Sequence, residues 1–157
     1  MNQEIERKFL IENLPDNLHH YSSTEIIQGY LAITKDGTEV RLRKKDERYF
    51  QTVKNGFGLQ RSEVEIEISA DQFEKLWSMT EGKRIEKVRH EIDHSGMKIE
   101  LDIYREILEG LIVAEVEFDS IELANAFIPP SWFGKEVTED ERYKNRNLVI
   151  YGMPDKQ

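Results

Sequence analysis

The stretch EIERKFLI, residues 4–11, places Glu4, Glu6 and Lys8 at every second position of a segment that otherwise resembles a strand. Side chains of a strand alternate between two faces, so one face of this segment is ionic and the other is mostly apolar. For one strand alone, a solvated sheet face is the simplest explanation. The remaining strands decide whether the ionic face has a function.

The composition sets limits on the class of protein. The chain has 157 residues, 34% of them charged, and a net charge of −9. We expect one domain over residues 1–157. The acidic balance argues against nucleic acid as a partner. There is no cysteine, which excludes disulfides and thiolate metal sites, and we see no signal peptide or apolar run that could span a membrane. We therefore predict a cytoplasmic protein without a membrane partner.

Strand signals dominate the sequence, because alternating, β-branched and aromatic segments are bounded by turn residues. Three amphipathic helices are also predicted, and they begin with capping-box spacing at Ser69, Asp119 and Thr138. The predicted strands cover residues 3–11, 25–34, 38–45, 48–54, 60–68, 84–93, 97–104 and 111–119.

Several turns between these strands contain glycine where a positive φ is needed. They are KDG at 35–37, DHSG at 93–96 and EG at 109–110, and they predict antiparallel hairpins. About eight mostly antiparallel strands with a few helices predict a β-dominated α+β fold, either a curved sheet or a barrel.

Ionic residues recur at alternate positions on almost every predicted strand, whereas the positions between them are largely apolar. The charges come as unmixed doublets, which a purely structural surface does not need, since like charges two residues apart repel. Only the strand at 25–34 lacks such a pattern. The residues are Glu4, Glu6 and Lys8; Arg41 and Arg43; Lys54; Glu63 and Glu65; Lys87 and Arg89; Glu100 and Asp102; Glu115 and Glu117.

If the sheet closes, we expect the helices to cover its apolar outside and the ionic face to line the interior. Unpaired ions cannot form a dry core, so such an interior must hold water, counter-ions and a ligand. Arginine and lysine on several strands suit a polyanion with phosphate oxygens. Carboxylates alone would repel that anion, but Mg²⁺ or Mn²⁺ can bridge the two. The interior therefore predicts a polyphosphate with bound metal.

These residues resemble the CYTH superfamily, also called the triphosphate tunnel metalloenzymes. Its N-terminal signature Glu-x-Glu-x-Lys stands here as EIERK at residues 4–8. The resemblance continues in order through EVRLRK, QTVK, RSEVEIEI, EKVRHEI, IELDIY, AEVEF and GKEVTEDERYKN, and so covers nearly the whole chain.

The resemblance implies an eight-stranded antiparallel barrel that binds a linear triphosphate, with two Mg²⁺ or Mn²⁺ ions. The residues matching the family's phosphate ligands are Lys8, Arg41, Arg43, Lys54, Lys87 and Arg89, with Lys135 as a further contact near the tunnel mouth. Those matching its metal ligands are Glu4, Glu6, Glu63, Glu65, Asp102, Glu115 and Glu117, and Glu67 and Glu100 share their parity. As catalytic residues we predict Glu4, Glu6, Lys8, Lys54 and Lys87.

Metal-dependent hydrolysis of inorganic tripolyphosphate or a nucleoside triphosphate is the predicted activity. Adenylyl cyclisation in the same tunnel is the first alternative, and hydrolysis of thiamine triphosphate is the second. A polyphosphate- or nucleotide-binding module without activity is the alternative from another class, but eight carboxylates facing a polyanion favour an enzyme. The expected assembly is a homodimer.

Overall fold

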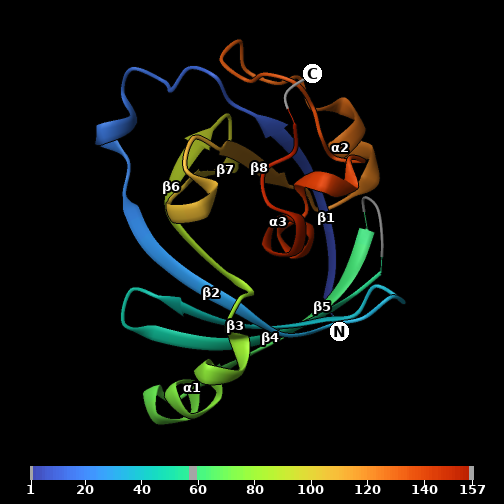
Figure 1. Ribbon diagram of the computed structural model, residues 1–157. Coiled ribbons are helices and arrows are strands. Elements are labelled where there is room, and N and C mark those ends of the chain that lie inside the picture. The colour runs from blue at the N-terminus through green and yellow to red at the C-terminus, as the bar shows by residue number, and fades with distance from the viewer. Residues whose placement is uncertain (1, 57–59, 156–157) are drawn as a thin grey trace.

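The computed structural model describes residues 2–56 and 60–155, and its strands close into one antiparallel barrel (Figure 1). Around the barrel the order is β1-β5-β4-β3-β2-β6-β7-β8. The predicted β-dominated fold is confirmed, and each predicted strand end lies within two residues of the observed one. The strands are β1 (Asn2–Leu10), β2 (Ser23–Ile33), β3 (Glu39–Lys45), β4 (Arg48–Asn55), β5 (Gln60–Ile68), β6 (Arg84–His94), β7 (Met97–Tyr104) and β8 (Ile112–Glu117).

The pairing register brings opposite charges together on the inner face of the barrel. Lys54 of β4 lies opposite Glu63 of β5, and Arg89 of β6 lies opposite Asp102 of β7. Directly opposed side chains on adjacent strands are near neighbours, so the register itself orders the interior charges.

The predicted hairpins are confirmed. β2 pairs with β3, β6 with β7 and β7 with β8, each antiparallel. Gly37 and Gly96 in two of these turns have φ of 89° and 80°, a region that only glycine adopts readily. The turn residues therefore fix which strands are neighbours.

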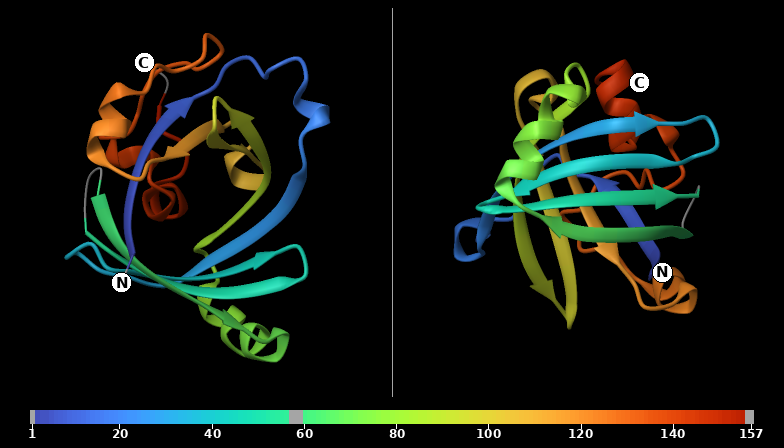
Figure 2. Two further views of the ribbon diagram at one scale, coloured as in Figure 1. Left: turned by 180° about the vertical axis from the view of Figure 1, so that it is seen from behind. Right: turned by 90° about the horizontal axis from the view of Figure 1, so that it is seen from below.

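Two short helices lie against the apolar outside of the barrel (Figure 2). α1 (Ala70–Trp77) begins with the predicted capping box at Ser69, and its Phe73 packs on Tyr49 of β4 with ring centroids 5.0 Å apart. α2 (Ile121–Ala126) contacts β1. The outer face of β5 is not fully covered, because Val64 and Ile66 remain 49% and 53% exposed. The prediction that helices cover the apolar face therefore holds only in part.

The other two predicted helix starts are wrong. α2 is capped by Ser120 rather than Asp119, since the Ser120 hydroxyl accepts a hydrogen bond from Leu123 N. No helix begins at Thr138, whose hydroxyl instead accepts a hydrogen bond from Lys8 N. Within the described ranges, no helix has both the length and the apolar character needed to cross a membrane.

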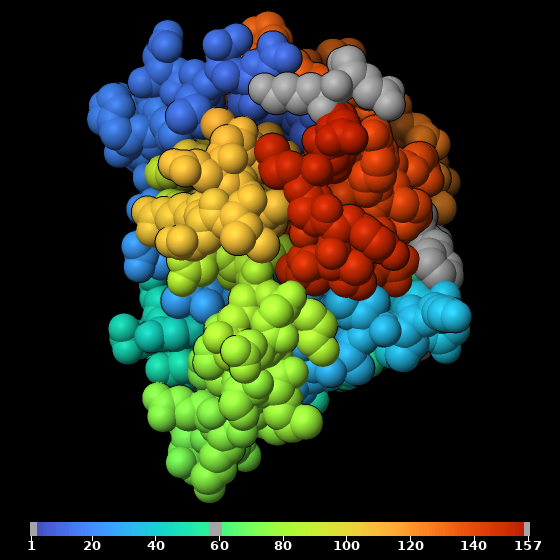
Figure 3. All heavy atoms as spheres, in the orientation of Figure 1, coloured from blue at the N-terminus to red at the C-terminus, as the bar shows by residue number. Residues whose placement is uncertain are grey.

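α3 (Asn145–Tyr151) lies inside one end of the barrel instead of on its outside (Figure 1). Leu148 is fully buried in a cluster with Tyr30, Tyr104 and Val113, which are inward-facing residues of the strands. In Figure 3 the atoms of α3 and of the short 3₁₀ helix η3 (Glu106–Leu108) fill the centre of this end. The interior is therefore apolar and closed at this end, and ionic only in the remainder.

We predict that Leu148→Ala lowers the free energy of unfolding by about 3 kcal/mol, because the truncation leaves a cavity between α3 and the barrel wall. Ile150→Ala is the matched control, since Ile150 lies on the same helix but is 50% exposed. Urea denaturation measures both. An equal loss of stability in the two variants would contradict the placement of α3 inside the barrel.

Candidate active site

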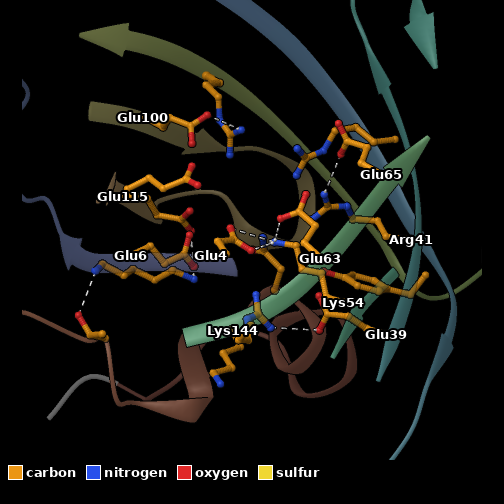
Figure 4. A pocket seen from close by; sticks show the side chains of 18 of the residues that line it. Glu4, Glu6, Glu39, Arg41, Lys54, Glu63, Glu65, Glu100, Glu115 and Lys144 are labelled. Atoms are coloured by element: carbon orange, nitrogen blue, oxygen red, sulfur yellow. Dashed lines mark hydrogen bonds and ion pairs between the residues drawn. The ribbon is translucent and has the colours of Figure 1, made fainter. Parts of the chain in front are cut away.

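The ionic inner face surrounds a cavity of about 240 Å³, to which all eight strands contribute side chains (Figure 4). Residues from Val137 to Asn145, on the segment before and at the start of α3, complete the lining. The structure therefore gathers most of the predicted site in one place. The predicted residues that line the cavity are Glu4, Glu6, Lys8, Arg41, Arg43, Lys54, Glu63, Glu65, Arg89, Glu115 and Glu117, together with Glu100.

One side of the cavity is crowded with carboxylates. Burial and the negative charges of Glu115 and Glu4 raise the pKa of Glu6 well above its usual value. Burial and a hydrogen bond with Glu4 raise the pKa of Glu63 to about 7, and burial and Glu4 raise that of Glu117. These shifts mean that the nearby cations do not fully offset burial and mutual repulsion.

Two lysines stand among these carboxylates. Lys54 Nζ lies 3.2 Å from Glu4 and 3.8 Å from Glu63 (Figure 4). Burial raises the pKa of Glu4, but the Lys54 ammonium and hydrogen bonds outweigh burial and lower this pKa to about 2. Lys8 Nζ lies 3.2 Å from Glu115. Both ammonium groups are therefore held at the boundary between the acidic side and the rest of the cavity.

Arginines crowd the other side of the cavity. Arg43 donates two hydrogen bonds to Gln28 Oε1, at 3.0 and 2.7 Å. Burial and the positive charges of Arg41 and Arg89 lower the pKa of Arg43 to about 9. Arg41 Nε is buried and has no hydrogen-bond partner in the described part of the chain. An anion bound here would relieve the repulsion and satisfy this donor.

Lys87 and Asp102 are buried and do not belong to the described residues that line the cavity. Asp102 accepts hydrogen bonds from Lys87 Nζ at 2.7 Å and from Arg89 Nε and Nη2 at 2.7 and 2.9 Å. Burial lowers the pKa of Lys87 to about 7. Both Asp102 oxygens are thus occupied, and this residue orients Arg89, which reaches the cavity.

The structure also separates Lys135 and Glu67 from the cavity lining. Lys135 is exposed, and its main-chain oxygen accepts a hydrogen bond from Leu10 N. Glu67 is an exposed residue of β5 that binds Arg48 at 2.7 Å. Neither side chain therefore lines the cavity, although Glu67 shares the strand parity of the lining residues and Lys135 stands at a motif position.

Five charged residues of the cavity were missed from the sequence, namely Glu39, Lys45, Arg61, Asp140 and Lys144. Arg61 and Glu39 continue the alternation of β5 and β3 by one step before Glu63 and Arg41, so extending that pattern would have identified them. Lys144 comes from the segment that leads into α3 (Figure 4), where there is no alternation to indicate which way it points.

The closed barrel and its divided ionic interior define a tunnel-type protein suited to a polyanion together with metal ions. Residues 2–140 match the family described as the CYTH domain. The chain belongs to this family.

Two relatives extend over almost the whole chain. An inorganic triphosphatase of Nitrosomonas europaea is 49% identical over 94% of this chain and 97% of its own length. An inorganic triphosphatase of Acetivibrio thermocellus is 35% identical over 95% of this chain and 94% of its own. A crystal structure of an inorganic triphosphatase, 46% identical, matches with a TM-score of 0.72 and covers 97% of this chain and all of that one.

More distant structures share the fold alone. A putative adenylyl cyclase from Hippeastrum, described as having a dominant triphosphatase activity, is 17% identical with a TM-score of 0.57 and covers 78% of this chain and 82% of its own.

We predict that Asp102→Asn lowers the free energy of unfolding by about 3 kcal/mol, because Lys87 then remains buried without a counter-charge and Arg89 keeps only its ion pair with Glu100. Asp93→Asn, on the exposed part of β6, is the control and should change stability by less than about 0.5 kcal/mol. Chemical denaturation at pH 7 measures both. A fully stable Asp102→Asn variant would contradict the structural role of this carboxylate.

Proposed function

We propose that the protein is a divalent-metal-dependent triphosphatase that hydrolyses inorganic tripolyphosphate inside the barrel. The observation that carries this proposal is the division of one cavity into a crowded acidic side and a crowded basic side. A polyanion neutralises the arginines, and metal ions neutralise the carboxylates and bridge to the same polyanion. The names of the two relatives above 30% identity support the same activity and the inorganic substrate.

The donor set of the acidic side suits a hard divalent cation. Carboxylate oxygens are the ligands that Mg²⁺ and Mn²⁺ prefer. Burial and neighbouring carboxylates raise the pKa values of Glu6, Glu63 and Glu117, and a divalent cation would offset both effects. In the described ranges no three acidic or histidine side chains are placed close enough together to hold a metal ion. We assign Glu4, Glu6, Glu63 and Glu117 as metal ligands, and we expect two ions.

A divalent ion held there would neutralise phosphate oxygens and lower the pKa of a bound water. Arg41, Arg43 and Arg89 bind the phosphate chain and hold it in line for attack, which is the main requirement of phosphoryl transfer. Lys8, between the two sides, binds the phosphate chain together with the arginines, and Lys54 neutralises the charge that develops on the leaving phosphate. Lys87 does not line the cavity. It donates a hydrogen bond to Asp102, and Asp102 in turn holds Arg89 in place.

Closure of the tunnel by α3 supports a short substrate. Because one end is filled by Leu148 and its apolar neighbours, a ligand enters from the other end and is limited in length. Adenylyl cyclisation gains little support, since the neighbours described as putative cyclases are below 20% identity and bear on the fold alone. Thiamine triphosphate hydrolysis, a cytoplasmic location and a homodimer stay predictions.

Glu6→Gln tests the proposed function directly. We expect kcat for tripolyphosphate in Mg²⁺ or Mn²⁺ to fall by at least about 100-fold, because the variant loses a charge on the acidic side needed to hold the metal. Glu122→Gln, an exposed residue of α2, should keep its activity. Phosphate release measures both. A normal kcat in Glu6→Gln would rule out the metal assignment.

Arg43→Ala should separate binding from chemistry. We expect KM for tripolyphosphate to rise by about tenfold, while kcat changes by less than about threefold, since Arg43 contacts substrate in both the ground and transition states. Arg105→Ala, which removes an exposed guanidinium, is the control. If Arg43→Ala had an unchanged KM, the basic side would not be the phosphate site.

A further inference from the structure

Arg7 lies between Glu6 and Lys8 in β1, but its side chain is on the outside of the barrel. Its guanidinium binds the carboxylate of Glu136 through Nε at 2.9 Å and Nη2 at 2.7 Å. Nη1 donates to the main-chain oxygens of Ala124 and Phe127, at 2.8 and 3.0 Å. Four hydrogen bonds and a side chain only 17% exposed make Arg7 unlike a solvated surface arginine.

Glu136 belongs to a segment that runs antiparallel to the end of β1. Gly134 N donates to Leu10 O, and Leu10 N donates to Lys135 O, both at 2.8 Å. This pairing continues the barrel wall past the place where β5 leaves β1. Arg7 therefore joins two elements to β1 at once, the end of α2 and this paired segment.

The same network ends on the main chain of Lys8. Thr138 Oγ1 donates to Glu136 Oε2 at 2.6 Å and accepts a hydrogen bond from Lys8 N at 3.0 Å. Val137 N donates to Lys8 O at 2.8 Å. Arg7, Glu136 and Thr138, which we call the Arg7 clasp, thus connect the outside of the barrel to the backbone of a residue whose side chain is inside.

The chain that follows the clasp reaches the cavity. Thr138, Asp140 and Lys144 line it, and the main-chain oxygen of Tyr143 accepts a hydrogen bond from Lys8 Nζ at 3.2 Å. Lys8 is therefore fixed twice, by its backbone through the clasp and by its ammonium group through the segment beyond it. A shift of the clasp would move both ends of this lysine.

We propose that Arg7 is a positioning residue for triphosphate binding, which acts from outside the barrel through Glu136 and Thr138 to fix Lys8 and the segment 138–145 around the substrate. The inference rests on the proposed function, because it assigns Lys8 to the phosphate chain. Arg7 itself touches neither substrate nor metal. Its effect is transmitted through hydrogen bonds and strand pairing.

The first test is steady-state hydrolysis of tripolyphosphate by Arg7→Met. We expect KM to rise by about tenfold with kcat within about threefold, because the cation that meets the substrate is no longer preorganised. Glu136→Gln should give a smaller rise in KM. It keeps one carbonyl acceptor for Arg7 but loses the charge.

Arg84→Met is the matched control. Arg84 is also an outward arginine that fixes the end of a helix, since it donates to Trp77 O and Thr80 Oγ1 and stacks over the Trp77 ring at 4.4 Å. It should lower the thermal midpoint of unfolding as Arg7→Met does, while KM stays at the wild-type value. A merely structural role for Arg7 would give this same result, and an unchanged KM in Arg7→Met would overturn the proposal.

A double-mutant cycle with Lys8→Met tests the route of the effect. We expect Arg7→Met to raise the Kd for tripolyphosphate, measured by calorimetry, by a clearly smaller factor in the Lys8→Met background than in the wild-type background. Simple addition of the two losses would overturn transmission through Lys8. If Arg7→Met does not fold, Thr138→Val replaces it in the same cycle. A wild-type protein that binds tripolyphosphate without hydrolysing it would overturn the proposed function, and the cycle would still test the clasp.

Discussion

The cost of removing charges from water governs this structure. The barrel encloses acidic and basic side chains from every strand except β2, and burying such groups without partners is prohibitive. The pairing register of the strands offsets part of this desolvation cost, because it places Lys54 beside Glu63 and Arg89 beside Asp102. Ion pairs such as Lys8–Glu115 and Arg89–Glu100 offset more of it. For the crowded charges that remain we propose a polyanion together with metal ions.

Closure of the barrel end adds a second constraint. α3 supplies the apolar contacts that the ionic inner face cannot make, through Leu148 against Tyr30 and Tyr104. The chain that leads into it lines the cavity with Lys144. The segment that completes the site therefore leads directly into α3, the helix that closes the tunnel. This continuity couples stability at this end of the barrel to the geometry around the substrate.

Alternation along the strands predicted most of the cavity lining, because parity in a strand is a property of local sequence. Closure into a barrel was implied by the family resemblance, since alternation alone fits an open curved sheet as well. Alternation could not predict the position of α3, since the pattern of an amphipathic helix does not indicate whether its apolar face meets the outside or the inside of a barrel. It also could not separate Asp102 from the other acidic residues, because its contacts with Lys87 and Arg89 depend on packing between strands. Lys135 lies outside the regular strands, where alternation gives no direction for a side chain, and its contact with substrate near the tunnel mouth stays a prediction.

Hydrolysis of tripolyphosphate by the wild-type protein, with Mg²⁺ or Mn²⁺ and with EDTA, tests the central claim most directly. If the cavity needs both the polyanion and metal ions, we expect metal-dependent release of phosphate and pyrophosphate in equal amounts, and no release in EDTA. Equal rates with metal and with EDTA would contradict the role of the acidic side. Absence of turnover in every condition would contradict the enzymatic account.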